Sequence, residues 1–337
     1  MNKLHGHDIV FEQFRRASER GRLAGSFLFV GPSGVGKRHF AVVLAKAVLC
    51  KGKAPAPLEP CESCESCRLF NAPPTEDTEF VSPHPDLTYI AKPPDKKSLP
   101  LELLIGDKEN RGRAGLCYSI SRTPFLGHGK VAIIDDADFL EAEGANALLK
   151  TLEEPPENTL LVLIGTSATK QLPTIRSRCK IIRFSPLPLL TLARLLFERG
   201  IVATQEQGLQ LAKRSNGGLD HAKELVDDAL DELRGELNKQ LSATTSDTVG
   251  FARRLNEFVA AAGKELAAQR RRLRLIFMIT VEQFRDKFRK GDETAARCLE
   301  RTLGALEQID RNINLPFIID AWCAEIKTSS PLTPGEG

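Results

Sequence analysis

Short apolar runs alternate with segments of helical periodicity over the first half of the chain. Between the runs, apolar residues recur at helical spacing, as they do in the helix predicted over residues 37–49. Strands that alternate with helices form a parallel α/β sheet whose ligands bind at the carboxyl ends of the strands. Four runs read as buried strands, namely SFLFV (26–30), KVAIIDDAD (130–138), TLLVLIGTS (159–167) and KIIRFSPL (180–187), and a short fifth strand is expected in DLTYI (86–90).

The pattern changes after Pro188, where amphipathic helices replace the alternation. LLTLARLLFERG, EQGLQLAKRS and LDHAKELVDDALDELRGELNKQL each show helical periodicity, and long helices follow SATTSDT, from about residue 249 to 327. The C-terminal SSPLTPGEG is expected to be disordered. The predicted domains are therefore a sheet domain (1–186) with a cysteine-rich module (50–67), a small helical domain (187–240), a C-terminal helical domain (241–330) and a tail (331–337).

Composition and charge narrow the class of protein only slightly. Hydrophobic residues make up 42% and charged residues 27% of the 337 residues, which is typical of a globular protein. A net charge of +3 is too small to establish nucleic-acid binding. The N-terminal MNKLHGHDIVFEQF contains no apolar signal-peptide segment, and no apolar run approaches the length of a membrane span. We therefore expect a cytoplasmic protein.

The stretch GPSGVGKRHF matches a phosphate-binding loop except at one position. Gly31, Gly34 and Gly36 allow backbone N–H groups to surround phosphate oxygens, and Lys37 reaches the β- and γ-phosphates. The next position normally carries the hydroxyl that ligates Mg²⁺, whereas Arg38 is cationic and has no lone pair to offer. The sequence predicts a loop of phosphate-binding ancestry with impaired Mg·ATP hydrolysis; a glycine turn that binds no nucleotide is the alternative.

Acids and hydroxyls follow two of the predicted strands. Asp135 fits the Mg²⁺-associated acid of a phosphate-loop ATPase, and Asp136 stands where such enzymes carry the glutamate that orients the attacking water. Aspartate is one methylene shorter, and a displacement of about 1 Å lowers a rate about a hundredfold. Thr166 or Ser167 is expected to act as a polar sensor near the γ-phosphate. A helix-capping turn and a strand-end turn remain the alternatives for these groups.

Four of the eight cysteines lie within eighteen positions of one another. Cys50, Cys61, Cys64 and Cys67 have the spacing C-x₁₀-C-x₂-C-x₂-C, which suits tetrahedral zinc in a reducing compartment. No catalytic acid accompanies them, so a structural Zn²⁺ site is predicted. His84 is the one evident histidine competitor, and four free thiols are the alternative.

Three segments together resemble the clamp-loader branch of the AAA+ superfamily. They are GRLAGSFLFVGPSGVGKRHFA, IIDDADFLEAEGANALLKTLEEPPENTLLVLIGTSA and LPTIRSRCKIIRFSPL, and the resemblance is dense over residues 5–186. It implies an α/β P-loop AAA+ core with a zinc-binding insertion, a helical lid and an all-α collar domain for oligomerisation, which RNINLPFIIDAW matches in style. The implied role is a subunit of a hetero-pentamer, with gamma/tau and delta subunits, that loads a sliding clamp onto primed DNA for a replicative polymerase.

The resemblance also implies a role for one arginine. Arg178 occupies the arginine position of the family's Ser-Arg-Cys motif, which projects into the ATP site of the adjacent subunit. Such an arginine finger stabilises the transferring phosphoryl group and contributes about 10³–10⁵ in rate. Arg176 lies nearby but does not fit the motif position. A solvated loop arginine is the alternative.

Three departures from the family pattern fall in one nucleotide site. Besides Arg38 and Asp136, Asp220 stands where ATPase members carry a sensor-2 arginine. We therefore expect a scaffold and arginine-finger donor whose own ATPase site is degenerate, so that ATP binding is doubtful and the chain itself is not the catalyst. The alternatives are an active AAA+ ATPase, either of the gamma/tau type or a helicase motor, and a zinc adaptor that only bridges replication proteins.

Two further stretches give weaker indications of function. Arg270, Arg271, Arg272 and Arg274 suit DNA contact, but a solvated helix face is the preferred interpretation. The apolar residues beside them, together with Phe317 and Trp322, are expected to pack in the collar core or against a neighbouring subunit. Residues 104–117 look like an insertion relative to the family pattern, without an assigned role.

Overall fold

The computed structural model divides the chain into two compact units, Met1–Lys223 and Glu224–Gly337. Each unit is described by itself. The structure describes residues 5–21, 23–52, 56–72, 82–93, 96–126, 129–226, 235, 247–263, 266–311 and 313–329. The tail (331–337), residues 242–246 of the polar break SATTSDT and most of the segment 227–241 lie outside these residues.

The described part of the first unit contains one parallel sheet with the strand order β2-β3-β4-β1-β5. The carboxyl ends of β1, β4 and β5 lie at the same level, because Val30 of β1 pairs with both Gly165 and Arg183. The prediction of five parallel strands is confirmed. Their bounds are β1 Gly25–Val30, β2 Leu87–Ile90, β3 Lys130–Ile134, β4 Thr159–Gly165 and β5 Lys180–Arg183.

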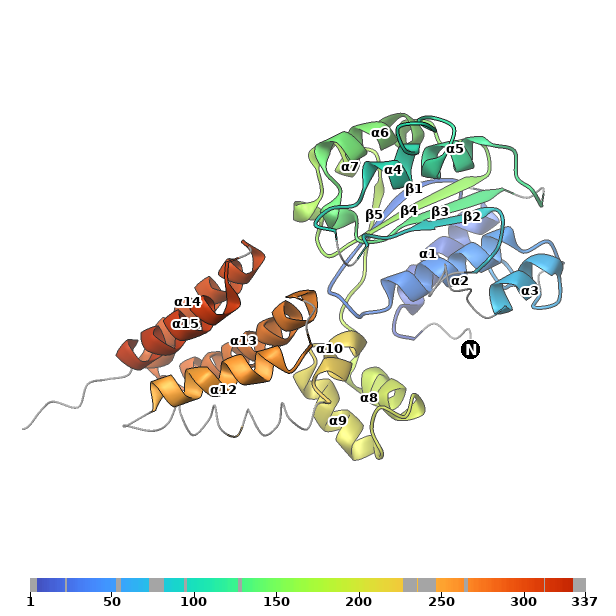
Figure 1. The fold of residues 1–337 in the computed structure, drawn as a ribbon. Helices are drawn as coiled ribbons and strands as arrows, with labels where there is room; N and C mark the ends of the chain where they lie inside the picture. The colour runs from blue at the N-terminus through green and yellow to red at the C-terminus, as the bar shows by residue number, and fades with distance from the viewer. Residues whose placement is uncertain are drawn as a thin grey trace, which may run out of the picture. The chain divides into compact units, whose positions relative to one another are not determined.

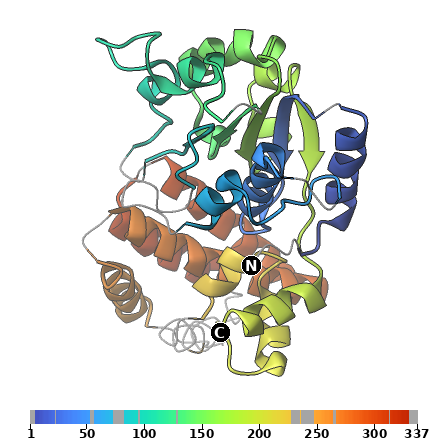
Figure 2. The ribbon, with the colours of Figure 1, turned by 90° about the vertical axis from the view of Figure 1, so that its right-hand side faces the viewer.

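Helices cover both faces of this sheet (Figure 1). On one face, Phe14 of α1 and Phe40 of α2 pack against Phe27 and Phe29 of β1. On the other face, Leu28 of β1 lies in a second core with side chains of α4 to α7. Figure 2 shows α1 beside β5, at the edge of the sheet. The helices are α1 Asp8–Glu19, α2 Lys37–Leu49, α4 Leu101–Ile105, α5 Gly115–Ser121, α6 Ala142–Glu153 and α7 Pro173–Arg176.

The remaining helices of the first unit are short. The segment α3 (Glu65–Asn71) belongs to the cysteine-rich module, while α8 (Leu189–Glu198), α9 (Gln205–Arg214) and α10 (Leu219–Glu224) follow the sheet. The helices α8 and α9 correspond to the first two helices predicted after Pro188, and α10 covers only the first six residues of the helix predicted over 219–241. Two 3₁₀ turns, Ala137–Phe139 and Ala168–Lys170, follow β3 and β4. The predicted division of the chain at 186 and 240 remains a prediction.

The described residues of the second unit form helices and the turns between them, and no strand. It contains α12 (Thr248–Ala260), α13 (Leu266–Arg289), α14 (Glu293–Asp310) and α15 (Leu315–Ser329). Phe277 and Trp322 are buried and pack 4.9 Å apart between ring centroids. The apolar residues beside the arginine run, such as Ile276, are also buried, as expected. Phe317 is 64% exposed, so it does not pack in the core of this chain.

No described helix combines the length and the apolar character that crossing a membrane requires.

Candidate functional site

The phosphate loop joins β1 to α2, as the glycine pattern predicts. Gly31, Gly34 and Gly36 all have positive φ angles, which residues with a side chain rarely adopt. Lys37 is the first residue of α2, and its buried ammonium donates to the carbonyl oxygens of Gly31 and Pro32, both at 2.6 Å. Burial lowers the pKa of Lys37. The loop therefore has the backbone of a phosphate site, with its lysine anchored on the loop itself.

Arg38 forms an ion pair with Asp135, the first acid after β3. The Asp135 carboxylate is buried and also accepts a hydrogen bond of 2.8 Å from the hydroxyl of Tyr89, in β2. Burial raises the pKa of Tyr89, and the nearby Asp135 charge raises it further. The cation directly after the loop lysine thus neutralises the first acid after β3.

Asp136 lies beside this pair in a left-handed backbone conformation, with φ of 55°. Its N–H donates to Asp135 Oδ1 at 2.9 Å. Burial and the neighbouring charge of Asp135 raise the pKa of Asp136, while Arg38 opposes the shift. The structure therefore brings Lys37, Arg38, Asp135 and Asp136 together at the carboxyl edge of the sheet.

The candidate sensor Thr166 follows β4 and is engaged by an acid that sequence reasoning did not single out. Its hydroxyl and its N–H both donate to Asp138 Oδ2, at 2.5 and 2.8 Å. Asp138 also accepts from the Gln171 amide. Ser167 instead begins the following 3₁₀ turn and accepts from the N–H of Thr169. The Thr166 hydroxyl is therefore bonded to the turn after β3, whereas the partner of Ser167 lies in its own turn.

Asp220 lies directly against the phosphate loop. The N–H of Leu219, at the start of α10, donates to the Gly34 carbonyl at 2.9 Å. A Cβ added at Gly34 would lie 2.7 Å from the backbone nitrogen of Asp220, so only glycine allows this approach. Asp220 is also close enough for its charge to raise the pKa of Lys37 against the effect of burial. The predicted sensor-2 position therefore meets the loop, and it carries an anion.

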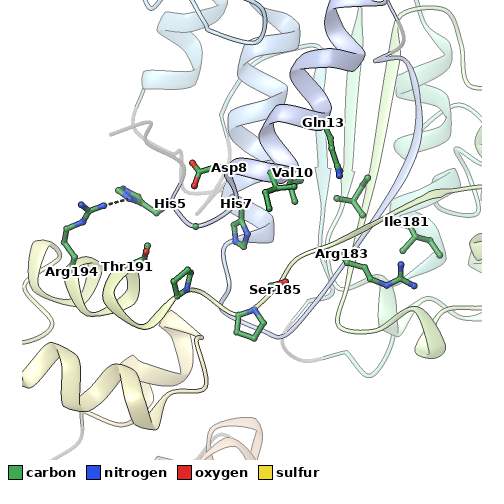
Figure 3. A pocket seen from close by; sticks show the side chains of 15 residues that line it. His5, His7, Asp8, Val10, Gln13, Ile181, Arg183, Ser185, Thr191 and Arg194 are labelled. Atoms are coloured by element: carbon green, nitrogen blue, oxygen red, sulfur yellow. Dashed lines mark hydrogen bonds between the residues drawn. The ribbon is translucent and has the colours of Figure 1, made fainter.

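A cavity of about 700 Å³ lies between the N-terminal segment, β5 and the start of α8 (Figure 3). Its polar lining includes Asp8, Arg183 and Arg194, and Arg194 lies 3.4 Å from His5 Nδ1. His7 connects this cavity with the phosphate loop, because its Nε2 donates to the Val35 carbonyl at 2.6 Å. Residues 5–13 and 181–194 line this cavity. No sequence pattern indicates it, because these two segments are far apart along the chain.

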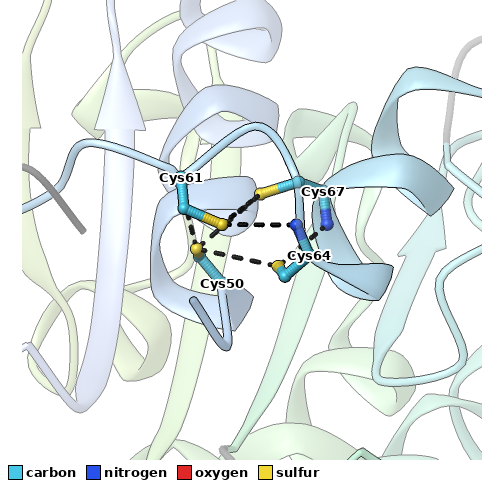
Figure 4. Close-up of side chains that lie close together, drawn as sticks. All are labelled: Cys50, Cys61, Cys64 and Cys67. Atoms are coloured by element: carbon cyan, nitrogen blue, oxygen red, sulfur yellow. Dashed lines mark hydrogen bonds between the residues drawn. The ribbon is translucent and has the colours of Figure 1, made fainter. Parts of the chain in front are cut away.

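The four clustered cysteines converge on one point (Figure 4). The Sγ atoms of Cys50 and Cys64 are 3.9 Å apart, those of Cys61 and Cys67 4.0 Å, and those of Cys50 and Cys67 3.7 Å. Four sulfurs at about 2.3 Å from a tetrahedral zinc lie about 3.8 Å from one another. A disulfide would require about 2.05 Å. The spacing therefore fits a four-thiolate metal site, and His84 is not a member of the cluster.

Backbone groups around the cluster stabilise thiolates. The N–H groups of Cys61, Cys64 and Cys67 point at Sγ atoms of Cys50, Cys61 and Cys64, at 3.3 to 3.5 Å. Hydrogen bonds from the backbone of Ser63 and Cys64 lower the pKa of Cys61 to about 5. Burial raises the pKa of Cys67. A divalent cation would offset the cost of ionising that buried thiol, because a metal-bound cysteine is deprotonated.

The module is attached to α2 at two points. Cys50 directly follows the last residue of that helix. Lys46, buried within it, pairs with Glu62 and donates to Asn71 Oδ1 at 2.9 Å. The chain also packs tightly here, since a Cβ added at Gly52 would lie 2.1 Å from Cys61 Sγ. The cluster is thereby held against the sheet domain.

Arg178 lies between α7 and β5 and contacts residues outside the phosphate loop. Its Nε and Nη2 atoms donate to Glu153 Oε1, and Nη1 donates to the Thr174 carbonyl. The side chain retains partial exposure. Tyr89, Asp138 and Glu153 contact predicted site residues, and no pattern in the sequence singles these three partners out.

A family model described as DNA polymerase III, delta subunit, matches residues 6–188, more than half of the 337-residue chain. The chain belongs to this family. This assignment confirms the expected clamp-loader resemblance, because the matched region contains the phosphate loop, the paired acids, the cysteine module and Arg178.

Two curated relatives of this DNA polymerase III subunit family differ in type. The delta' (delta-prime) subunit from Bacillus subtilis is 34% identical over 187 residues, which cover 56% of this chain and 49% of the relative. The tau subunit from Escherichia coli is 30% identical over 239 residues, covering 70% of this chain and 34% of the relative. The match thus spans about half of the delta' relative and a third of the tau relative.

A solved structure of a gamma subunit-related protein from Thermotoga maritima is also similar. It is 18% identical, has a TM-score of 0.46, and the match covers 94% of this chain and 98% of that one.

Proposed function

We propose that this chain is a delta-prime-like subunit of the clamp loader of DNA polymerase III, which cannot hydrolyse ATP and donates an arginine to a neighbouring ATPase. The ion pair between Arg38 and Asp135 carries this proposal. In a phosphate-loop ATPase, a hydroxyl and an acid at these two positions hold Mg²⁺. Here a fixed guanidinium charge neutralises the acid, so a metal ion would have to displace a side chain that is covalently part of the site.

Other groups around the loop support the same conclusion. Asp136 is shorter than the glutamate that orients water, and Asp220 places a negative charge against the loop that would receive the γ-phosphate. Thr166 is hydrogen bonded to Asp138. Nucleotide binding without hydrolysis is compatible with the intact glycine backbone and with Lys37.

Arg178 is the proposed functional residue of this subunit. Because it is partly exposed and belongs to the Ser-Arg-Cys motif, its guanidinium can reach a phosphate presented by an adjacent subunit. There it would neutralise the charge on the transferring phosphoryl group, a contribution of about 10³–10⁵ in rate. A subunit without its own hydrolysis can still control the hydrolysis of its neighbour in this way.

The cysteine module is proposed to hold one structural Zn²⁺ through Cys50, Cys61, Cys64 and Cys67. The sulfur spacing and the N–H groups directed at the sulfurs support this assignment. All four ligand positions come from the protein, so a tetrahedral ion has no open position for substrate. The ion would fix the module on the end of α2.

The proposed partners are gamma/tau and delta subunits in a hetero-pentamer, which together bind the sliding clamp and primed DNA. In this arrangement, α8 to α10 form the lid and α12 to α15 form the collar that joins the subunits. The exposed Phe317 suits a subunit contact in that collar.

A reconstituted loader tests the proposal directly. Arg178→Ala should abolish most of the DNA-stimulated ATP hydrolysis of the complex while the complex still assembles, and Arg176→Ala serves as the matched control. The purified chain alone should show negligible turnover of Mg·ATP. Robust turnover by the chain alone would favour the alternative, an active gamma/tau-type ATPase. Unchanged hydrolysis in the Arg178→Ala complex would favour a zinc adaptor.

A further inference from the structure

The guanidinium of Arg178 is held by a carboxylate of its own subunit. Oε1 of Glu153 accepts from Nε at 2.6 Å and from Nη2 at 2.5 Å. Nη1 donates to the Thr174 carbonyl at 3.0 Å and to Ser177 Oγ at 3.2 Å. All three guanidinium nitrogens therefore have partners within the subunit, although this side chain is the one that must reach a neighbour.

The position of Glu153 is unfavourable for the helix that carries it. It is the last residue of α6, and a negative charge at a helix C-terminus faces the negative end of the helix dipole. The following residue, Glu154, adds a second acid at the same end. Stabilisation of α6 therefore does not account for the Glu153 carboxylate, whereas its pairing with Arg178 does.

We propose that Glu153 restrains Arg178 in the free subunit and releases it when the phosphates of a neighbour's nucleotide compete for the guanidinium. Glu153 is then a positioning residue, because it acts on the reaction only through Arg178. This inference rests on the proposed function of Arg178 as a donor to the adjacent ATPase.

The exposure of the pair makes such an exchange feasible. The Arg178 side chain is 28% exposed and that of Glu153 is 50% exposed. Ion pairs so close to water are weak, because solvent screens the charges in both the paired and the separated states. A triphosphate carries more negative charge than one carboxylate and can also accept bidentate hydrogen bonds from arginine. The nucleotide is therefore the stronger partner once the two subunits are in contact.

The restraint predicts a gain of activity when it is removed. In a reconstituted loader, Glu153→Gln should raise DNA-independent Mg·ATP hydrolysis by about two- to fivefold, the factor expected for loss of an exposed ion pair. The KM for ATP should fall while the kcat measured with saturating primed DNA stays constant, because only the competition for the guanidinium has changed. Glu154→Gln is the matched control, since it removes the same charge from the same helix end.

A double-variant comparison separates restraint from a structural role. Because Glu153 acts through Arg178, Glu153→Gln should have no effect on hydrolysis in an Arg178→Ala background. A structural role would persist in that background and would also alter assembly or the unfolding temperature, which gel filtration and thermal unfolding measure. Glu153→Ala, which removes the carboxylate entirely, should shift hydrolysis in the same direction as Glu153→Gln.

The outcomes distinguish this inference from the proposed function. If Arg178→Ala leaves hydrolysis intact, the proposed function fails and the inference fails with it. If Arg178→Ala abolishes hydrolysis while Glu153→Gln leaves it unchanged or lowers it, the restraint is wrong and the proposed function stands. An increase that persists in the Arg178→Ala background also overturns the restraint.

Discussion

The guanidinium of Arg38 lies against the carboxylate of Asp135, and Tyr89 donates to the same oxygen of that carboxylate. One buried acid is thus shared by the residue after the phosphate-loop lysine and by a tyrosine from the edge strand β2. This relationship joins the start of α2, the end of β3 and β2 into one network.

Restoring the hydroxyl at position 38 should not create an ATPase. Arg38→Thr leaves Asp136 and Asp220 unchanged, so turnover of Mg·ATP by the purified chain should remain negligible. Because Asp135 then lacks its cation in a largely buried position, unfolding should become easier by about 1–3 kcal/mol. A coupled-enzyme assay and chemical denaturation measure the two effects. Arg38→Lys should retain more stability, and measurable hydrolysis by Arg38→Thr would contradict the prediction.

Asp136→Asn should stabilise the protein at neutral pH. The folded state raises the pKa of Asp136 above its ordinary value, so the folded protein binds this proton more tightly than the unfolded chain does. Stability from this group is therefore lost as the pH rises from the ordinary aspartate range through the raised pKa. Asparagine removes that loss and tolerates the left-handed backbone.

Thermal unfolding at several pH values checks this effect. The gain in stability from Asp136→Asn should be greatest near pH 7. It should disappear below the ordinary aspartate pKa of about 3.9, where the Asp136 carboxyl is protonated in both the folded and the unfolded state. Asp135→Asn is the contrasting variant, because it removes the partner of Arg38 and should destabilise the protein at neutral pH. Equal or lower stability of Asp136→Asn at pH 7 would contradict the prediction.

Gly52→Ala should weaken the proposed binding of zinc by the cysteine module. The added Cβ would lie 2.1 Å from Cys61 Sγ and 2.8 Å from Cys61 Cβ, so the sulfur must move away from the other three. A drop in zinc affinity of about 10- to 100-fold is expected, the range for changes just outside a ligand shell. Competition with a chromophoric chelator measures the affinity.

The control for this prediction is a glycine-to-alanine substitution at a position where the added methyl group meets no other side chain. Among the described residues, no atom beyond the neighbouring helix backbone lies within 4 Å of a Cβ added at Gly304, which lies in α14. Gly304→Ala should therefore leave zinc affinity unchanged and stabilise the helix by about 0.5–1 kcal/mol. Equal zinc affinity of Gly52→Ala and the unaltered protein would show that the module accommodates the methyl group.

Thr302→Val should destabilise the helical unit by about 1–3 kcal/mol, the cost of a buried donor without a partner. The Thr302 hydroxyl accepts from Trp322 Nε1 at 3.1 Å and donates to the Cys298 carbonyl at 2.7 Å. Trp322 is the single tryptophan of the chain, so its fluorescence reports unfolding of this unit.

Thr280→Val provides the matched control. Thr280 is as buried as Thr302 and likewise donates to the carbonyl four residues earlier, at 2.8 Å. Its replacement leaves no indole donor without a partner, so a much smaller loss is expected. An equal loss of stability in Thr302→Val and Thr280→Val would show that the hydrogen bond from Trp322 adds nothing to the stability of the helical unit.

The elements of the sheet domain were predictable because the contrast between apolar runs and glycine or proline is strong there. The helix predicted over 37–49 has those bounds, since the glycine loop fixes its start and Cys50 its end. The cysteine cluster was predictable for a related reason: short spacings leave the four sulfurs few arrangements other than a common centre.

The pairings that define the candidate site were not predictable from the sequence. Tyr89 meets Asp135 because β2 pairs with β3, and Glu153 meets Arg178 because the end of α6 lies beside α7; both depend on the tertiary arrangement. Periodicity predicts that Phe317 packs in the collar core or against a neighbouring subunit, and its exposure in α15 excludes only the core. Helical periodicity shows which apolar side chains lie on the same face of a helix, but it does not show whether another helix covers that face.

The helix α2 begins at Lys37 and ends next to Cys50. At 1.5 Å per residue, its thirteen residues form a rod about 20 Å long. The phosphate loop and the cysteine module therefore lie at opposite ends of one continuous helix, so a shift of α2 along its axis would displace both together.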